Sequence, residues 1–308
     1  MHRVIRLRRS VLSVPGNRDR MIEKSRSLPA DMVMLDLEDS VPLAEKDQAR
    51  TALVQHLRQG GWSETTVGLR INDLESSFAY RDIIDAVEEA GEVVDVLVIP
   101  KVNSGIDVAV VDSLLTQIEK RMSISRPIGL EASIETARGM REVTAIAEAS
   151  SRLESLIFGI ADYGASLGMP SRGLSGHGDA EPESFGQRWH FPLSRMVMAA
   201  KAAGLQAIDA PYGDFKDEAG LQRSCSVSRS MGYDGKWAIH PGQVETINAA
   251  YTPEDEEVQR AREILKAYRA SQKEGAGSLA LEGKMIDRAS VRLAEQTAAK
   301  WDQIRSRD

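Results

Sequence analysis

Short apolar runs alternate with longer amphipathic stretches along the first 250 residues, and this alternation constrains the fold more than any other feature. Eight runs have the length of a strand and are rich in Val, Ile and Leu, as expected for strands buried on both faces. They are Ser10–Val14, Met32–Leu37, Thr66–Ile71, Val94–Ile99, Pro127–Ala132, Leu153–Ile160, Leu205–Ala210 and Gly235–Ile239. Repeated βα units of this kind predict a parallel sheet covered by helices.

The intervening stretches have the periodicity of helices. Ile83, Val87 and Ala90 fall on one helical face, and the stretch Val108–Ile118 carries a similar apolar stripe. An open, doubly wound sheet would show the same alternation. Because there are eight units and no Gly-x-Gly-x-x-Gly follows the first strand, we predict an α/β fold of the closed TIM (β/α)8 barrel type.

Two segments break this rhythm. Gly164–Pro192 is rich in Gly, Pro, Ser and His, and a loop of that length is usually functional or mobile. Towards the C-terminus, a charged helix over Pro253–Ala270 is followed by a flexible linker over Ser271–Ser278 and a second helix over Met285–Trp301. We therefore predict two domains, a barrel over residues 1–250 and a helical arm over residues 251–308.

Composition argues against several classes of protein. The 39 basic residues face 46 acidic ones, which gives a net charge of −7, and no basic block is long enough for us to expect a nucleic-acid partner. No apolar run approaches the ~20 residues that cross a bilayer, so we expect no membrane association. The single cysteine, Cys225, excludes an internal disulfide and suits a reducing compartment. Since Met1–Arg9 contains no apolar leader segment, we expect a cytoplasmic protein.

Charged side chains gather where the predicted strands end, which is where a TIM barrel keeps its reacting groups. They are Asp36, Glu38, Asp39, Arg70, Asn72, Lys101, Glu131, Glu135, Asp162 and His240. Acids that crowd one rim repel each other unless a cation lies among them. Glu135 and Asp162 follow adjacent strands, and two carboxylates so placed suit Mg²⁺, with Mn²⁺ as the alternative.

Several of these residues also have a simpler structural interpretation. Asp39 could cap a helix that begins near Pro42, and Lys101 could do no more than pair with one of the acids. His240 could be a hydrogen-bonded residue at a strand end. Cys225 lies within a predicted helix, where packing is its expected role.

Seven segments carry a resemblance to a known family, in the same order along the chain. They are Arg9–Gly16, Leu35–Val41, Leu69–Asn72, Ile99–Lys101, Ile134–Gly139, Phe158–Tyr163 and Ala238–Pro241. Together they resemble the citrate lyase β-subunit-like proteins of the HpcH/HpaI aldolase superfamily, which include malyl-CoA and citramalyl-CoA lyases. The resemblance covers nearly the whole chain. It implies a Mg²⁺-dependent lyase for which coenzyme A is part of the substrate.

The resemblance also implies roles for residues of the barrel. Glu135 and Asp162 match the family's metal ligands, and Glu38 and Asp39 match acids that hold metal-bound water. Arg70 matches the arginine that binds a small 2-oxo acid and polarises its carbonyl group.

Further roles implied by the resemblance lie outside the rim. Arg18 and Lys24 match basic residues that contact the nucleotide of CoA. Asp287 matches a catalytic base on a C-terminal arm, which in relatives closes as a lid over the barrel of a neighbouring subunit. The resemblance thus implies a homo-oligomer, either a trimer or a dimer of trimers.

The reaction implied is a reversible aldol or Claisen-type cleavage of a malyl-, methylmalyl- or citramalyl-CoA to an acyl-CoA and glyoxylate or pyruvate. Two alternatives stay open at this point. One is a malyl-CoA or citramalyl-CoA thioesterase, and the other is a citrate lyase β subunit that acts on a substrate bound to an acyl carrier protein. The presence of Asp287 together with the whole set of acids argues against a noncatalytic binding module.

Overall fold

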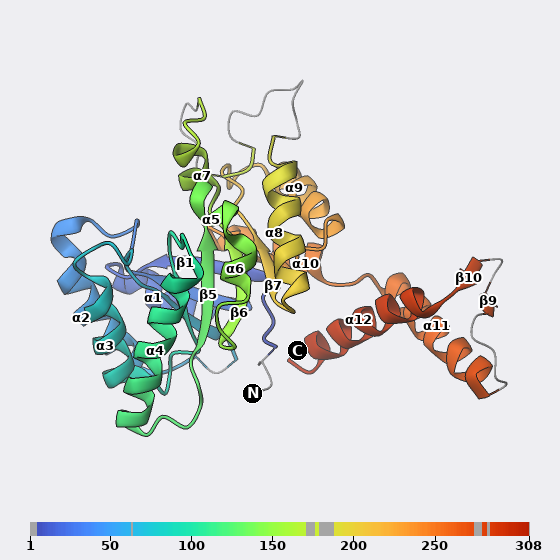
Figure 1. Ribbon diagram of the computed structural model, residues 1–308, viewed down its shortest axis with the longest axis horizontal. Coiled ribbons are helices and arrows are strands. Elements are labelled where there is room, and N and C mark those ends of the chain that lie inside the picture. The colour runs from blue at the N-terminus through green and yellow to red at the C-terminus, as the bar shows by residue number, and fades with distance from the viewer. Residues whose placement is uncertain are drawn as a thin grey trace. The chain divides into compact units, whose positions relative to one another are not determined.

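The computed structural model describes residues 5–62, 64–170, 176–178, 188–273, 279–281 and 284–307. The chain divides into two compact units between Ala249 and Ala250 (Figure 1). Each unit is described by itself below.

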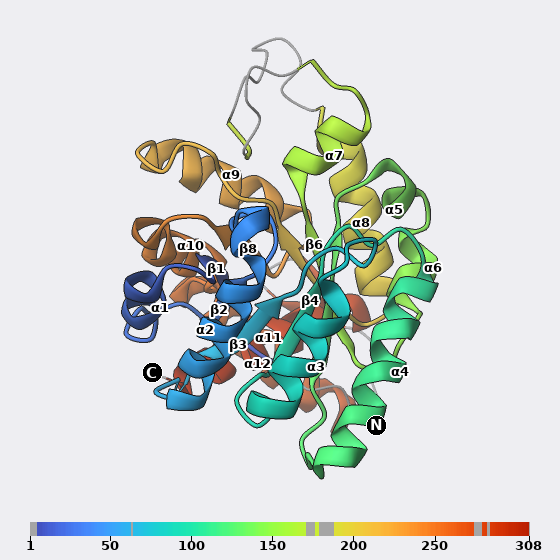
Figure 2. The same ribbon diagram turned by 90° about the vertical axis from the view of Figure 1, so that its left-hand side faces the viewer.

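Eight parallel strands form a closed barrel in the first unit, with β1 paired to both β2 and β8. The strands are β1 (Ser10–Pro15), β2 (Met32–Asp36), β3 (Thr66–Arg70), β4 (Val96–Ile99), β5 (Gly129–Ile134), β6 (Leu153–Phe158), β7 (Gln206–Asp209) and β8 (Gly235–Ala238). Figure 2 shows the strands at the centre with helices around them. The TIM barrel predicted from the alternation of apolar runs is confirmed.

Helices follow the strands in chain order. They are α1 (Asp19–Ser25), η1 (Leu43–Glu45), α2 (Lys46–Gln59), α3 (Ala79–Ala90), α4 (Gly105–Met122), α5 (Ala137–Arg141), α6 (Val143–Ala147), α7 (Ile160–Ser166), α8 (His190–Ala202), α9 (Glu218–Ser230), η2 (Pro241–Gln243) and α10 (Val244–Tyr251). As the periodicity predicts, α3 buries Ile83, Val87 and Ala90. Of the helices in the described ranges, none combines the length and apolarity needed to cross a membrane.

The interior of the barrel is filled by alternate residues of the strands, because successive side chains of a strand point to opposite faces. The buried cluster there consists of Val11, Met32, Met34, Val96, Val98, Ile157, Ile208 and Trp237. This packed core leaves the two ends of the barrel as the places where polar groups gather.

All eight strands differ from their predicted bounds by one or two residues at one or both ends, and β5 and β6 show why. β5 begins at Gly129, because Pro127 has no N–H to donate and the N–H of Ile128 donates to the Glu119 side chain, 2.8 Å away. β6 ends at Phe158, because the chain then turns into α7 and Gly159 is its N-cap.

At the amino end of the barrel, called the floor here, charged side chains pair with one another. Arg8 precedes β1, and it is fully buried between Glu131 of β5, at 3.2 Å, and Glu154 of β6, at 2.6 Å. Arg9 pairs with Asp31 at 2.8 Å. The prediction that Glu131 lies among the acids at the opposite end is therefore wrong, since this residue is buried in the floor.

The second unit contains two helices that pack on each other, α11 (Asp255–Lys273) and α12 (Arg288–Arg305). Between them a short antiparallel ribbon pairs β9 (Leu279–Leu281) with β10 (Lys284–Ile286). Met285 therefore lies in a strand, and the prediction that the last helix starts there is wrong. The linker glycines near residue 275 lie outside the described residues.

The long segment after β6 is partly helical. α7 extends to Ser166 and α8 starts at His190, so both ends of the predicted loop Gly164–Pro192 belong to helices. Residues 171–175 and 179–187 lie outside the described residues.

Candidate active site

A buried ion pair joins the last residues of two neighbouring strands at the carboxyl end of the barrel. The parallel register places Asp36 of β2 beside Arg70 of β3. Arg70 donates from Nε and Nη2 to the two carboxylate oxygens of Asp36, each at 2.7 Å. Its guanidinium also lies over the ring of Trp237, 5.1 Å from the centroid. Burial opposes the charge of Asp36, but the attraction of Arg70 and the hydrogen bonds that the carboxylate accepts together outweigh it and lower the pKa of Asp36. The pair and the ring fix the Arg70 guanidinium in place.

Glu38 brings a second carboxylate to this arginine. Its Oε2 atom lies 3.0 Å from Arg70 Nη1, and its backbone carbonyl accepts a hydrogen bond of 2.6 Å from Lys46 Nζ. Burial raises the pKa of Glu38 to about 8, against the attraction of Arg70. The nearby carboxylates of Glu135 and Asp39 raise it further. Glu38 is therefore held in a place where a negative charge is poorly compensated.

We call four carboxylates at this end of the barrel the rim acids: Glu38, Asp39, Glu135 and Asp162. Lys101, two residues beyond β4, contacts each of them. Its Nζ atom bonds to Glu38 and lies 3.3 Å from Asp39 Oδ1 and 3.7 Å from Asp162 Oδ2. Its backbone N–H donates to Glu135 Oε1 at 2.6 Å. The structure thus brings together the acids that the sequence placed after three different strands.

Glu135 follows β5 directly and is almost fully buried, with 1% of its surface exposed. The carboxylate has room there because residue 159 is glycine, since a Cβ atom at Gly159 would overlap the Glu135 side chain. Burial raises the pKa of Glu135, and the charges of Arg70 and Lys101 oppose that rise. A glycine at the start of α7 is therefore part of the site.

Asp162 lies in the first turn of α7 rather than at the end of a strand. Its side chain is 38% exposed and points towards the Lys101 ammonium group. Burial raises the pKa of Asp162, although Lys101 lowers it. Glu135 and Asp162 therefore reach the same site from consecutive elements, one buried and one open to solvent.

The composition of the rim suits a hard divalent cation. Among the described residues, no three His, Cys, Asp or Glu side chains already converge as a metal site. Mg²⁺, however, often takes one or two carboxylates and keeps several waters. The buried Oε2 atom of Glu38 has the charge of Arg70 at 3.0 Å but accepts no hydrogen bond within the described part of the chain, so it could accept one from such a water. The residues present therefore fit a magnesium ion, and its ligation by Glu135 and Asp162 remains a prediction.

The two basic residues predicted to contact a nucleotide lie on α1. Arg18 is the N-cap residue and Lys24 lies in the last turn, and both side chains are exposed. Within the described ranges neither forms an ion pair with the rim acids. Their predicted role remains a prediction.

Asp287 belongs to the second unit, where it is the N-cap of α12. Its Oδ1 atom accepts hydrogen bonds from the backbone N–H and the hydroxyl of Ser290, at 2.9 and 3.1 Å. These bonds lower the pKa of Asp287. Its predicted role as a base remains a prediction.

The simpler interpretations hold for two further residues. His240 is exposed, accepts a hydrogen bond from the N–H of Gly242 at 3.1 Å, and stacks on Phe215. Cys225 is buried in α9, where burial raises the pKa of its thiol to about 11. Asp39 caps no helix, because the N-cap of η1 is Pro42 without a side-chain bond.

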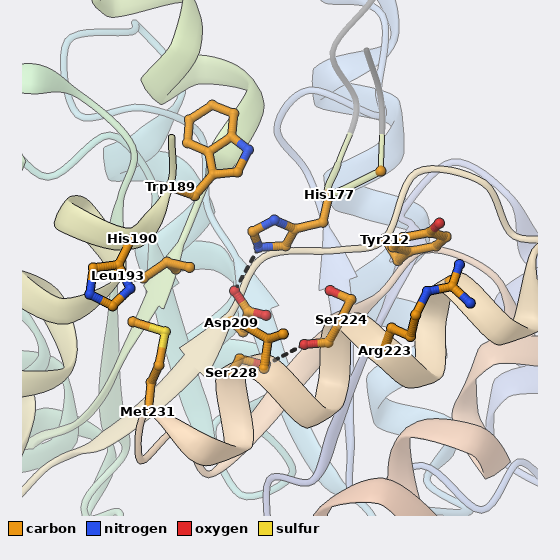
Figure 3. A pocket seen from close by; sticks show the side chains of 13 residues that line it. His177, Trp189, His190, Leu193, Asp209, Tyr212, Arg223, Ser224, Ser228 and Met231 are labelled. Atoms are coloured by element: carbon orange, nitrogen blue, oxygen red, sulfur yellow. Dashed lines mark hydrogen bonds and ion pairs between the residues drawn. The ribbon is translucent and has the colours of Figure 1, made fainter. Parts of the chain in front are cut away.

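A cavity of about 360 Å³ lies beside α8 and α9, away from the rim acids (Figure 3). Asp209 in its wall accepts hydrogen bonds from His177 Nε2 at 2.9 Å and from Lys236 Nζ at 2.5 Å. Burial opposes the charge of Asp209, but Lys236 and His177 outweigh it and hold its pKa well below the usual range. The carboxylate is thus compensated, and none of the predicted site residues lines this cavity.

Comparisons with known proteins identify the family of the chain. Residues 9–241 match the model of the HpcH/HpaI aldolase/citrate lyase family. The L-malyl-CoA/beta-methylmalyl-CoA lyase of Cereibacter sphaeroides is 38% identical over 94% of this chain and 93% of its own length. The citrate lyase subunit beta of Leuconostoc mesenteroides is 33% identical over 94% and 92%. The crystal structure of CitE from Mycobacterium tuberculosis with magnesium, acetoacetate and coenzyme A has a TM-score of 0.74 and 28% identity, over 95% of this chain and 97% of the other. The chain therefore belongs to the HpcH/HpaI aldolase/citrate lyase family, as its seven motifs predict.

Proposed function

We propose that this protein is a Mg²⁺-dependent carbon–carbon lyase that cleaves a malyl-CoA-like thioester to an acyl-CoA and a 2-oxo acid, and that the reaction is reversible. The observation that carries the proposal is the convergence of the rim acids beside Arg70. The relatives named malyl-CoA lyases, and the structure solved with magnesium and coenzyme A, support it.

Glu135 and Asp162 would hold the magnesium ion, and Glu38 and Asp39 would accept hydrogen bonds from water beside it. When bound, the ion supplies Lewis-acid polarisation of the oxygen on which negative charge develops. Arg70 would donate to the same oxygen from Nη1, which lies 3.0 Å from Glu38 Oε2, because Asp36 engages its Nε and Nη2 atoms. In this arrangement the arginine is already oriented before the substrate arrives.

Asp287 would move the proton of the thioester partner. In cleavage, the substrate hydroxyl would lose its proton to solvent and become the carbonyl of the 2-oxo acid, while the bond to the carbon next to the thioester breaks and leaves its electron pair there as an enolate. That carbon would then take a proton from Asp287, which regains one from solvent. In the synthetic direction, the carboxylate removes that proton. Because an ionised carboxylate is a weak base for a carbon acid, exclusion of water at the moment of transfer is part of the proposal.

We propose that the second unit acts as a cover for the barrel of a neighbouring subunit, in a homo-oligomer built on trimers. The first unit would then be the catalytic domain, with Arg18 and Lys24 contacting the nucleotide of CoA. A cytoplasmic location fits the single, buried Cys225.

The activity is tested by incubating the purified protein with Mg²⁺, acetyl-CoA or propionyl-CoA, and glyoxylate or pyruvate, and by measuring product masses. We expect a malyl-CoA-type adduct in the presence of Mg²⁺ and none with EDTA. Full activity in EDTA would contradict the proposal. Free CoA released from malyl-CoA without an oxo acid would indicate the thioesterase. Reaction only with an acyl-carrier-protein substrate would indicate a citrate lyase subunit.

The shared site is tested by mixing two inactive variants, Asp287→Ala and Glu135→Gln. We expect the mixture to recover part of the activity, because a mixed oligomer can combine an intact barrel with an intact arm. If subunit exchange is verified and no activity returns, the arm does not act on a neighbouring subunit.

A further inference from the structure

Lys101 is the residue that connects the rim acids. Its ammonium group reaches the carboxylates of Glu38, Asp39 and Asp162, and its backbone N–H holds Glu135. Side chain and backbone thus make separate contacts to different acids. A residue that only neutralised one acid would not need this arrangement.

The backbone of Lys101 is also unusual. Its φ angle is 49°, in the left-handed region that residues with a Cβ atom rarely adopt. This conformation costs free energy and persists only where the surroundings determine it, most often at functional sites. Here it aims the N–H at Glu135 while the side chain extends towards the other rim acids.

The ammonium group of Lys101 pairs with rim acids that Arg70 does not engage. Arg70 is engaged by Asp36 and Glu38, and Lys46 Nζ donates to backbone carbonyls. Asp39 and Asp162 have Lys101 as their cationic partner among the ion pairs of the described residues. Without a divalent cation, these carboxylates would repel each other if Lys101 were neutral.

We propose that Lys101 is a positioning residue whose ammonium group keeps the rim acids together before Mg²⁺ binds and then competes with Mg²⁺ for them. The inference rests on the proposed function, since it assumes that the rim acids are the magnesium site. The ammonium group organises the site and at the same time weakens its affinity for the metal, so that Mg²⁺ binding displaces the side chain.

The test is the affinity for Mg²⁺ alone, measured by calorimetry and by the Mg²⁺-induced change in melting temperature, without substrate. Lys101→Met removes the charge but keeps most of the length of the side chain and the backbone N–H to Glu135. Lys101→Arg keeps the charge. Lys120→Met is the matched control, because Lys120 is exposed in the last turn of α4.

We expect Lys101→Met to bind Mg²⁺ about fivefold more tightly or better, as for two ligands that compete for one site. The melting temperature of this variant should be lower than that of the wild type in EDTA and should rise further with Mg²⁺. The Lys101→Arg and Lys120→Met variants should stay within about twofold of the wild-type affinity. If Lys101→Met does not fold, Lys101→Gln serves for the same measurement.

The inference is overturned if the wild type binds Mg²⁺ and the uncharged variant binds it equally or more weakly. That result leaves the proposed function intact. A merely structural lysine would give that result, because its loss would lower the melting temperature equally with and without the metal. A wild type that does not bind Mg²⁺ would overturn the proposed function as well.

Discussion

The two ends of the barrel both carry clusters of charged residues, but the clusters are built differently. On the floor, four arginines pair with four carboxylates among the described residues: Arg6, Arg8, Arg9 and Arg126 with Asp31, Asp95, Glu131 and Glu154. At the rim, Asp36 and the four rim acids share Arg70 and Lys101. A balanced cluster needs nothing from outside, whereas an unbalanced one attracts a further cation. The comparison separates charges that hold the barrel from charges that act on a ligand.

The largest effect should come from removing a rim charge. Glu135→Gln keeps the shape of the side chain but loses its charge, so we expect turnover to fall about 1000-fold or more, as several kcal/mol of transition-state stabilisation are lost. The melting temperature in EDTA should not fall, because burial already opposes this charge. Glu148→Gln, at an exposed position, is the control. Turnover within about tenfold of the wild type would exclude Glu135 as a metal ligand.

On the floor, a comparable change should affect stability instead. Arg8→Met leaves Glu131 and Glu154 buried without this partner, and loss of one member of a buried ion pair costs about 3–5 kcal/mol. Urea unfolding measures the loss, and turnover per folded molecule should be unchanged. Adding Glu131→Gln should restore part of the stability. A free energy of unfolding within about 1 kcal/mol of the wild type would show that the floor is not a stabilising network.

Arg70 combines features of both clusters, since it is paired with a buried carboxylate like a floor residue but lies at the rim. Its replacement therefore shows whether it stabilises the barrel or acts on the ligand. Arg70→Lys keeps the charge and loses the planar fork that engages Asp36, so kcat/KM for the oxo acid should fall about 100-fold. The KM for the CoA ester should not change. If only the CoA-ester KM changes, Arg70 does not bind the oxo acid.

The smallest effect concerns pH. Because the pKa of Glu38 is raised from 4.5 to about 8, chiefly by burial, the folded state holds this proton more tightly than the unfolded state. The stability that this residue contributes is complete below its ordinary pKa and is lost as the pH rises towards 8. In EDTA, the melting temperature of Glu38→Gln should therefore fall less than that of the wild type over this range. Equal slopes for the two proteins would show that Glu38 does not titrate there.

The sequence was sufficient for the barrel and for the set of rim acids, because alternating apolar runs and polar strand ends are local patterns. It misplaced Glu131, since a two-residue error in the bounds of β5 moved this residue from the floor to the rim. The pairing of Asp36 with Arg70 follows from the register of neighbouring strands, which the sequence alone does not give.

Other features depend on contacts between distant parts of the chain. The role of Gly159 becomes visible only when Glu135 is seen against it. The ring of Trp237 under Arg70 joins residues of strands far apart in the sequence. The ribbon of β9 and β10 consists of strands of three residues each, too short for a periodicity to develop.

The pairing of β1 with β8 has a consequence for the synthesis of the protein. The first strand to leave the ribosome completes its hydrogen bonds only after Ala238, the last residue of β8, has been made. Arg8 has its partner Glu154 only after 146 further residues have been made. Contacts so distant in sequence form late, because a long loop must close first. The β1 edge of the sheet can therefore close only late in the elongation of the chain.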